Sequence, residues 1–268
     1  MLKRIKNEYT YISTFGRIFR ALKSIEAEPD YIVPLQIASH AEKNPDSIAI
    51  YYEDSEISYK ELILRSNKYA QWFLKIGLSK GDVVALMMEN RPEFLACWIG
   101  ITQVGGTVAL INTNLNSQAL DYSLNISQAK NLILGKELLE NFSSTQQEVK
   151  DNFSTWVQDG KQESSHFKNL DEVLDNISDN KPVIDYVVSN SDSGLYIYTS
   201  GTTGNPKAAT LSHKRLRLMM LGFKGAIRPN KNDKIYNVLP LYHSAGGVIA
   251  AGLALTSGAS LVLKRKFS

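Results

Sequence analysis

From about residue 58 onward, apolar residues recur with helical spacing, and short continuous apolar runs separate the helical stretches. Ser58 and Glu61 have the spacing of a capping box, and the helix that they begin is expected to end at Gly77. The run Val83–Met88 has the length of a buried strand, and Pro92 suits the first turn of the next helix. This alternation predicts an α/β fold of mostly parallel sheets with helices on both faces.

Later segments continue the alternation. We expect a helix to begin at Ser117 and two more to span 212–226 and 247–256. Further strands are expected at 107–111, 131–134, 195–198, 208–211, 234–239 and 260–263.

Two stretches depart from this pattern. Residues 140–180 are polar, and we expect them to form a surface excursion from the α/β domain. Basic and apolar side chains interleave over residues 1–23, which predicts an amphipathic helix. Such a helix either rests on an anionic membrane surface or is solvated with some contact to the core. The expected organisation is therefore a basic amphipathic segment over 1–30 and one incomplete domain over 31–268.

Composition narrows the classes of function. The 30 Lys and Arg against 27 Asp and Glu give a net charge of +3, which is too small to predict nucleic-acid binding. Cys97 is the single cysteine, so an intrachain disulfide is excluded, and the four histidines lack the spacing of metal ligands. We expect a cytoplasmic protein, peripheral at the membrane if its first helix binds lipid, and the sequence does not predict an oligomeric state.

The strongest chemical signal follows the expected strand at 195–198. Its loop contains four hydroxyl side chains, two glycines and a lysine. Glycine lets the backbone approach a ligand closely, hydroxyl groups donate hydrogen bonds to phosphate oxygens, and lysine adds positive charge. The pattern predicts a loop for polyphosphate, although a flexible surface turn would have the same composition; it is neither a Walker loop nor a dinucleotide fingerprint. The residues are Thr199, Ser200, Gly201, Thr202, Thr203, Gly204, Asn205, Pro206 and Lys207.

The string Thr-Ser-Gly-Thr-Thr-Gly-x-Pro-Lys over 199–207 resembles the phosphate-binding signature of the adenylate-forming superfamily. That superfamily contains acyl-CoA synthetases, luciferases and the adenylation domains of peptide synthetases. The resemblance implies that Thr199–Gly204 and Lys207 clamp the β- and γ-phosphates of ATP. Asn205 and Pro206 belong to the loop but not to this binding set. A carboxylate then attacks the α-phosphorus, which yields acyl-AMP and pyrophosphate. Lys207 would be a catalytic residue that stabilises charge on the leaving pyrophosphate.

Other segments resemble the superfamily in the expected order. They are Ser58–Leu62, Gly81–Ala85, Glu89–Glu93, Leu211–His213 and Leu239–Gly247. The last of these resembles the block beside the carboxylate substrate, which implies a substrate pocket that includes Tyr242, His243, Gly246 and Gly247. His243 would contact the acyl carboxylate or gate the acyl tunnel as a catalytic residue, whereas an isolated histidine near an apolar helix is more often a packing residue.

Positions that are less diagnostic than the phosphate loop, at 110–115, 196–199 and 208–209, are most similar to the very-long-chain acyl-CoA synthetase and fatty-acid transport protein branch. This similarity implies a ligase that activates a fatty acid with ATP, accompanied by Mg²⁺, and transfers the acyl group to CoA. Two alternatives remain open. One is an adenylating ligase for another acid, such as carnitine or an aryl acid, and the other is a membrane-associated protein of fatty-acid uptake.

The resemblance also implies parts that this sequence lacks. The blocks that meet adenine, magnesium and ribose are missing, and so is the small C-terminal domain with the lysine that promotes adenylation. We therefore expect an N-terminal fragment that binds ATP weakly at most and is inactive alone. We also expect its last strand, near Leu261, to be left as an exposed sheet edge.

Overall fold

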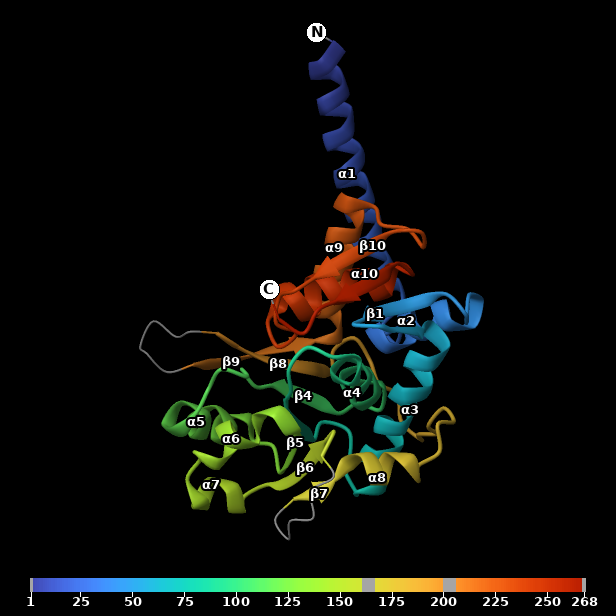
Figure 1. Ribbon diagram of the computed structural model, residues 1–268. Coiled ribbons are helices and arrows are strands. Elements are labelled where there is room, and N and C mark those ends of the chain that lie inside the picture. The colour runs from blue at the N-terminus through green and yellow to red at the C-terminus, as the bar shows by residue number, and fades with distance from the viewer. Residues whose placement is uncertain (1, 161–166, 200–205, 267–268) are drawn as a thin grey trace.

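A computed structural model describes residues 2–160, 167–199 and 206–266, and two β-sheets organise this part of the chain (Figure 1). The larger sheet, as far as these residues show it, has seven strands in the order β7-β6-β5-β3-β4-β8-β9. Neighbouring strands are parallel except β8 and β9, which form an antiparallel hairpin. The strands are β3 (Val83–Met87), β4 (Thr107–Leu110), β5 (Asn131–Gly135), β6 (Ser154–Gln158), β7 (Lys168–Asn169), β8 (Ser193–Thr199) and β9 (Lys207–Ser212).

The smaller sheet joins segments from the two ends of the chain. Within the described ranges its order is β10-β11-β1-β2. In β11, Leu261 pairs with Ile235 on one side and with Ile50 on the other, and it is fully buried. The expectation of an exposed edge near Leu261 is therefore wrong, because a strand some 200 residues earlier in the sequence covers that edge. The strands are β1 (Ile48–Tyr52), β2 (Ser55–Ser58), β10 (Lys234–Asn237) and β11 (Ser260–Leu263).

Helices cover both faces of the larger sheet, as expected. Along β3, Val84 and Leu86 belong to the main hydrophobic core, whereas Ala85 and Met87 belong to a second core on the opposite face. The main core also contains α3 and α4, and eleven of the 12 residues of α4 are buried. The helices are α1 (Leu2–Ala27), α2 (Val33–Lys43), α3 (Tyr59–Lys75), α4 (Pro92–Gln103), α5 (Ser117–Ser127), α6 (Leu139–Ser143), α7 (Gln147–Asp151), α8 (Leu170–Asp175), α9 (His213–Ile227), α10 (Gly252–Ser257), the 3₁₀ turn η1 (Lys136–Leu138) and the π-helical turn η2 (Ser244–Ala251).

The sequence correctly predicted how α3 begins and ends. The hydroxyl of Ser58 accepts a hydrogen bond from the Glu61 amide, and the Glu61 carboxylate accepts one from the Ser58 amide, so the predicted capping box at the start of α3 is confirmed. The predicted helix end is also confirmed, because Gly77 adopts the left-handed conformation (φ 81°) just after α3.

The polar stretch 140–180 is more than a surface excursion. It contributes β6 and β7 to the larger sheet, and β6 pairs with β5 over five residues. Trp156 and Val157 of β6 are buried, and the Trp156 ring packs edge-on against Trp72 at 5.4 Å between centroids. The strand was missed because its few apolar residues are flanked by polar sequence, and its burial comes from neighbours distant in the chain.

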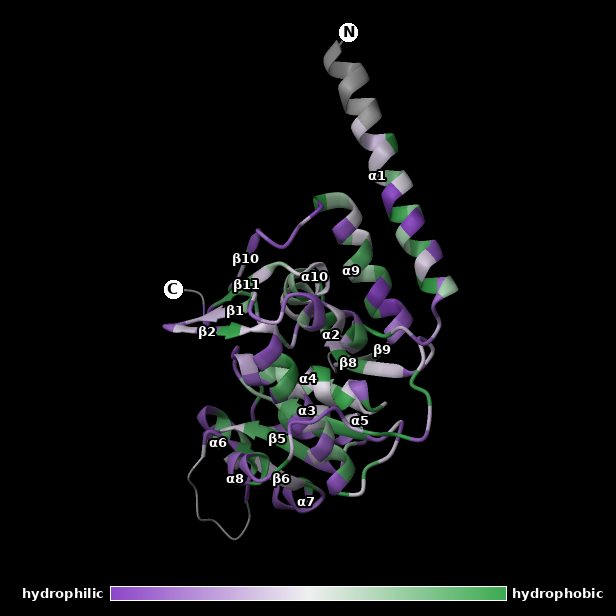
Figure 2. Cartoon of the chain, turned by 90° about the vertical axis from the view of Figure 1, so that its right-hand side faces the viewer, coloured by the Kyte–Doolittle hydropathy of each residue, from purple (hydrophilic) through white to green (hydrophobic). Residues whose placement is uncertain are grey.

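The first helix docks on α9 with its C-terminal half only. Figures 1 and 2 show its N-terminal half projecting beyond the end of α9. Ile18 lies against Gly225, and the Arg17 Nε donates a hydrogen bond to the Gly225 carbonyl (3.0 Å). At the other end of the contact, the buried Arg217 pairs with Glu28 (3.4 Å). No helix among the described residues is long and apolar enough to cross a membrane.

The packing of α3 on α4 depends on the absence of a side chain at Gly100. A Cβ atom there would lie 2.0 Å from the Ser66 carbonyl oxygen, which belongs to the backbone and cannot move aside cheaply. We expect Gly100→Ala to lower the free energy of unfolding by about 2 kcal/mol, as measured by urea titration.

Gly222 in α9 is the matched control, because nothing lies within 4 Å of a Cβ atom at that position. Gly222→Ala should raise the free energy of unfolding by roughly 0.5–1 kcal/mol through helix propensity. Equal stability of the two alanine variants would contradict this account of the α3–α4 contact.

Candidate functional site

The hairpin of β8 and β9 flanks the predicted phosphate loop. Thr199 at the end of β8 pairs with Lys207 at the start of β9, so the two ends of the loop lie side by side. Ser200, Gly201, Thr202, Thr203 and Gly204 lie outside the described residues. Lys207 is exposed at the mouth of the hairpin.

Strand register places this hairpin beside the turn that follows β4. In the parallel pair β4–β8, Leu110 is opposite Ile197, so two residues further on Asn112 is level with Thr199. Because β3, β4 and β8 are parallel, the segments that leave their carboxyl ends lie along the same edge of the sheet. This edge is where open α/β sheets bind their ligands.

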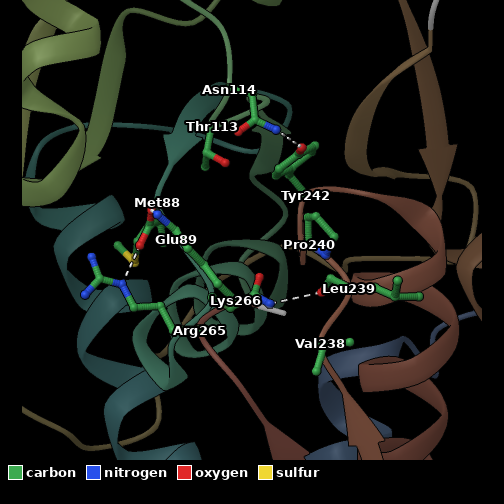
Figure 3. A pocket seen from close by; sticks show the side chains of 11 residues that line it. Met88, Glu89, Thr113, Asn114, Val238, Leu239, Pro240, Tyr242, Arg265 and Lys266 are labelled. Atoms are coloured by element: carbon green, nitrogen blue, oxygen red, sulfur yellow. Dashed lines mark hydrogen bonds and ion pairs between the residues drawn. The ribbon is translucent and has the colours of Figure 1, made fainter. Parts of the chain in front are cut away.

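A cavity of about 350 Å³ opens along this edge, between the two sheets (Figure 3). Its walls come from segments that follow the carboxyl ends of four strands. Met88, Glu89 and Asn90 follow β3; Thr113 and Asn114 follow β4; Val238, Leu239, Pro240 and Tyr242 follow β10; Arg265 and Lys266 follow β11.

Of the predicted pocket residues, Tyr242 lies in the wall of this cavity. It is 7% exposed, and its hydroxyl accepts a hydrogen bond from the Asn114 amide (3.3 Å). Burial raises the pKa of Tyr242 above its usual value, so the phenol is neutral at physiological pH. His243 is exposed and is not among the residues that line the cavity; its ring lies 5.0 Å from the Tyr242 ring.

Gly246 and Gly247 are buried in η2 and pack against the chain that precedes them. A Cβ atom at Gly246 would lie 2.4 Å from the Pro240 carbonyl oxygen, and one at Gly247 would lie 2.1 Å from that of Leu241. Both positions therefore require glycine for a close approach of two backbones. Their predicted place in a substrate pocket stays a prediction, although a π-helical turn is often found at a functional site.

The cavity has one charged wall. Glu89 pairs with Lys266 at 2.7 Å and also with Arg265. These cations lower the pKa of Glu89 despite the opposing effect of its partial burial, so it is ionised at neutral pH. The opposite side is apolar, with Val238 and Leu239 among its side chains. Such a cavity suits a molecule with an apolar part and an anionic group.

Sequence reasoning missed several cavity residues, above all Asn90, Asn114 and Arg265. The available signal was their position, since each follows a predicted buried strand within a few residues. The strand order that brings the three segments together could not be deduced from local patterns.

His213 is completely buried, and its burial lowers its pKa to about 4. The cap of α9 is the preceding residue Ser212, whose hydroxyl accepts a hydrogen bond from the Arg215 amide. In the part of the chain that the structure describes, no three His, Cys, Asp or Glu side chains are grouped so that they could hold a metal ion.

The chain is similar in sequence to fatty acid transport proteins. "Long-chain fatty acid transport protein 6" of Mus musculus is 36% identical over 234 residues, which is 86% of this chain and 37% of that relative. The chain thus spans well under half the length of this relative.

Solved structures extend the likeness to the fold. The N-terminal domain of FACL13 from Mycobacterium tuberculosis matches with a TM-score of 0.78 at 23% identity, over 88% of this chain and 58% of that one. A long-chain-fatty-acid-CoA ligase (FadD1) from Archaeoglobus fulgidus matches with a TM-score of 0.77 at 25% identity, over 90% of this chain and 48% of that one.

The model of the family described as "AMP-binding enzyme" matches residues 37–268, which include both sheets, the hairpin and the cavity. The chain belongs to this family of AMP-binding enzymes.

Proposed function

We propose that the protein to which this chain belongs activates a fatty acid with ATP, forming acyl-AMP and then acyl-CoA. The observation that carries the proposal is the common sheet edge shared by the β8–β9 hairpin and the cavity beside Tyr242. An arrangement of this kind brings a polyphosphate and a carboxylic acid within reach of each other. Holding two reactants in this way removes much of the entropic barrier to their reaction.

In this proposal, some residues of the chain bind ATP and others stabilise the charge that develops during the reaction. Thr199, Ser200, Gly201, Thr202, Thr203 and Gly204 would hold the β- and γ-phosphates of ATP. The exposed Lys207 would bind the pyrophosphate as negative charge builds on it. Mg²⁺ would arrive with ATP, bound to its phosphates, and CoA would be the acceptor of the acyl group.

The acid would be recognised by the segment around Tyr242 and His243. An apolar wall and neighbouring cations suit an amphiphilic acid better than a small polar one. The fatty-acid proteins among the relatives and solved structures support the same substrate class.

Lys207→Ala tests the catalytic proposal. In pyrophosphate exchange with a panel of fatty acids, we expect the variant of the full-length protein to lose at least about 100-fold in rate, because one preorganised charge at the leaving group is removed. Lys60→Ala is the control, since Lys60 is an exposed lysine in α3. If the two variants exchange equally fast, Lys207 has no such role; if the wild-type full-length protein exchanges with no acid, adenylation itself is rejected.

A second candidate function is peripheral membrane contact, which would suit a protein of fatty-acid uptake. In α1, four large apolar side chains are exposed: Tyr11 (67%), Ile12 (71%), Phe15 (54%) and Phe19 (60%). Lys23 lies 5.1 Å from the Phe19 ring centre, so positive charge borders the apolar residues. Aromatic residues beside basic ones are typical of helices that lie in the interface of an anionic membrane.

The triple variant Ile12→Ser, Phe15→Ser, Phe19→Ser tests this contact by sedimentation with vesicles of phosphatidylcholine and phosphatidylserine. We expect its binding to fall more than about tenfold, because each lost apolar side chain removes a favourable transfer free energy. The matched control is Val183→Ser, Val187→Ser, which removes two exposed apolar side chains (93% and 61%) outside α1. Equal binding by the two variants, or none by the wild type, would contradict membrane contact through α1.

A further inference from the structure

A single buried side chain joins the larger sheet to the segment that carries Tyr242. Asn90, three residues beyond Met87 at the end of β3, is 5% exposed. Its amide nitrogen donates hydrogen bonds to the carbonyls of Leu239 (3.0 Å) and Lys264 (3.1 Å). Its amide oxygen accepts a hydrogen bond from the Leu241 backbone N–H (2.8 Å). One side chain thus satisfies three backbone groups from two segments of the smaller sheet.

These three contacts require an asparagine. The Leu241 N–H can only donate, so the atom facing it must be an acceptor, and the two carbonyls need donors. An aspartate of the same shape would keep the acceptor but turn an anionic oxygen toward two carbonyl oxygens. A leucine of similar size would leave these three backbone groups, of which the Leu241 N–H is buried, without their side-chain partner.

The segment held by Asn90 leads directly to the predicted substrate residues. Leu241 precedes Tyr242, and the His243 amide donates a hydrogen bond back to the Pro240 carbonyl (3.1 Å). The position of this backbone therefore sets where the Tyr242 and His243 rings lie. A second asparagine of the larger sheet, Asn114, holds the far end of Tyr242 through its hydroxyl.

Asn90 also lines the cavity from the opposite sheet, so the contact crosses the site. Lys264, its third partner, follows β11 and bonds back to Asn237 at the end of β10 (3.0 Å). The carboxyl ends of β3, β10 and β11 are consequently connected at one point. A shift of either sheet relative to the other would have to break this connection.

We propose that Asn90 is a positioning residue for acid activation: it holds the backbone of Leu239–Leu241 so that Tyr242 and His243 meet the fatty-acid substrate. This inference rests on the proposed function and adds to it a residue that need not contact the reacting atoms.

The variants that test it are Asn90→Asp and Asn90→Leu in the full-length protein. We expect kcat/KM for the fatty acid to fall about 10- to 100-fold, while the KM for ATP changes less than about twofold, because the β8–β9 hairpin does not depend on Asn90. The matched control is Asn190→Asp. Asn190 is equally buried (5% exposed), and its amide donates to the carbonyls of Ile25 and Glu28, away from the cavity.

The Asn190→Asp control distinguishes a positioning role of Asn90 from a general effect on the stability of the fold. Asn190→Asp should lower the melting temperature by a similar amount without the selective loss for the fatty acid. If both variants lose activity alike, or if Asn90→Asp raises the two KM values together, Asn90 is a structural residue only and the inference is overturned. If the wild-type protein activates no acid, the proposed function fails, and hydrogen exchange of the backbone still decides whether Asn90 holds this segment.

Hydrogen exchange on the 268-residue chain needs no catalysis. In the wild type, the Leu241 amide should be protected, because its hydrogen-bond acceptor is the Asn90 side chain. In Asn90→Leu, peptides covering 239–246 should exchange at least about tenfold faster, while those covering β4 and β5 stay unchanged. An unprotected Leu241 amide in the wild type would overturn the inference even if no variant folds.

Discussion

Parallel pairing of β3, β4 and β8 is the constraint on which the rest of the structure depends. Parallel strands all leave a sheet at the same edge, so the segments that follow β3, β4 and β8 must lie next to one another. The same pairing requires crossover helices, and these bury both faces of β3 in two hydrophobic cores. The rigidity of the site edge is thus a consequence of the core.

The smaller sheet completes the cavity from the other side. It shares the main hydrophobic core with the larger sheet and is also attached to it through polar contacts at the strand ends. Because Asn90 and Asn114 both reach across to the segment 239–242, the position of Tyr242 depends on both sheets. Placing Tyr242 at such a junction couples its position to the relative placement of the two sheets.

The N-terminal helix α1 is connected to the segments that precede and follow the β8–β9 hairpin. Arg217 of α9, the helix after β9, contacts the Glu28 carbonyl, and Asn190, which precedes β8, donates to the same carbonyl. The end of α1 is thereby tied to the supports of β8 and β9, while its exposed apolar residues lie further toward the N-terminus.

The sequence by itself determined the features that depend on neighbouring residues. The capping box at Ser58 and Glu61, the end of α3 at Gly77 and the buried strand that became β3 are confirmed, because hydrogen bonds and side-chain periodicity within one element are local properties. The motif at 199–207 likewise indicated the family, because the identity and order of its residues are contained in the sequence itself.

Tertiary structure alone decided which segments meet. The stretch 140–180 supplies two strands, Leu261 is covered by β1 rather than exposed, and Asn90 bonds to residues about 150 positions later. Each of these outcomes follows from strand order and from burial against distant segments, which no local pattern encodes. A polar side chain such as Asn90 has the same appearance in the sequence whether it faces solvent or is buried and bonds to three backbone groups, and only the packing of the two sheets distinguishes these cases.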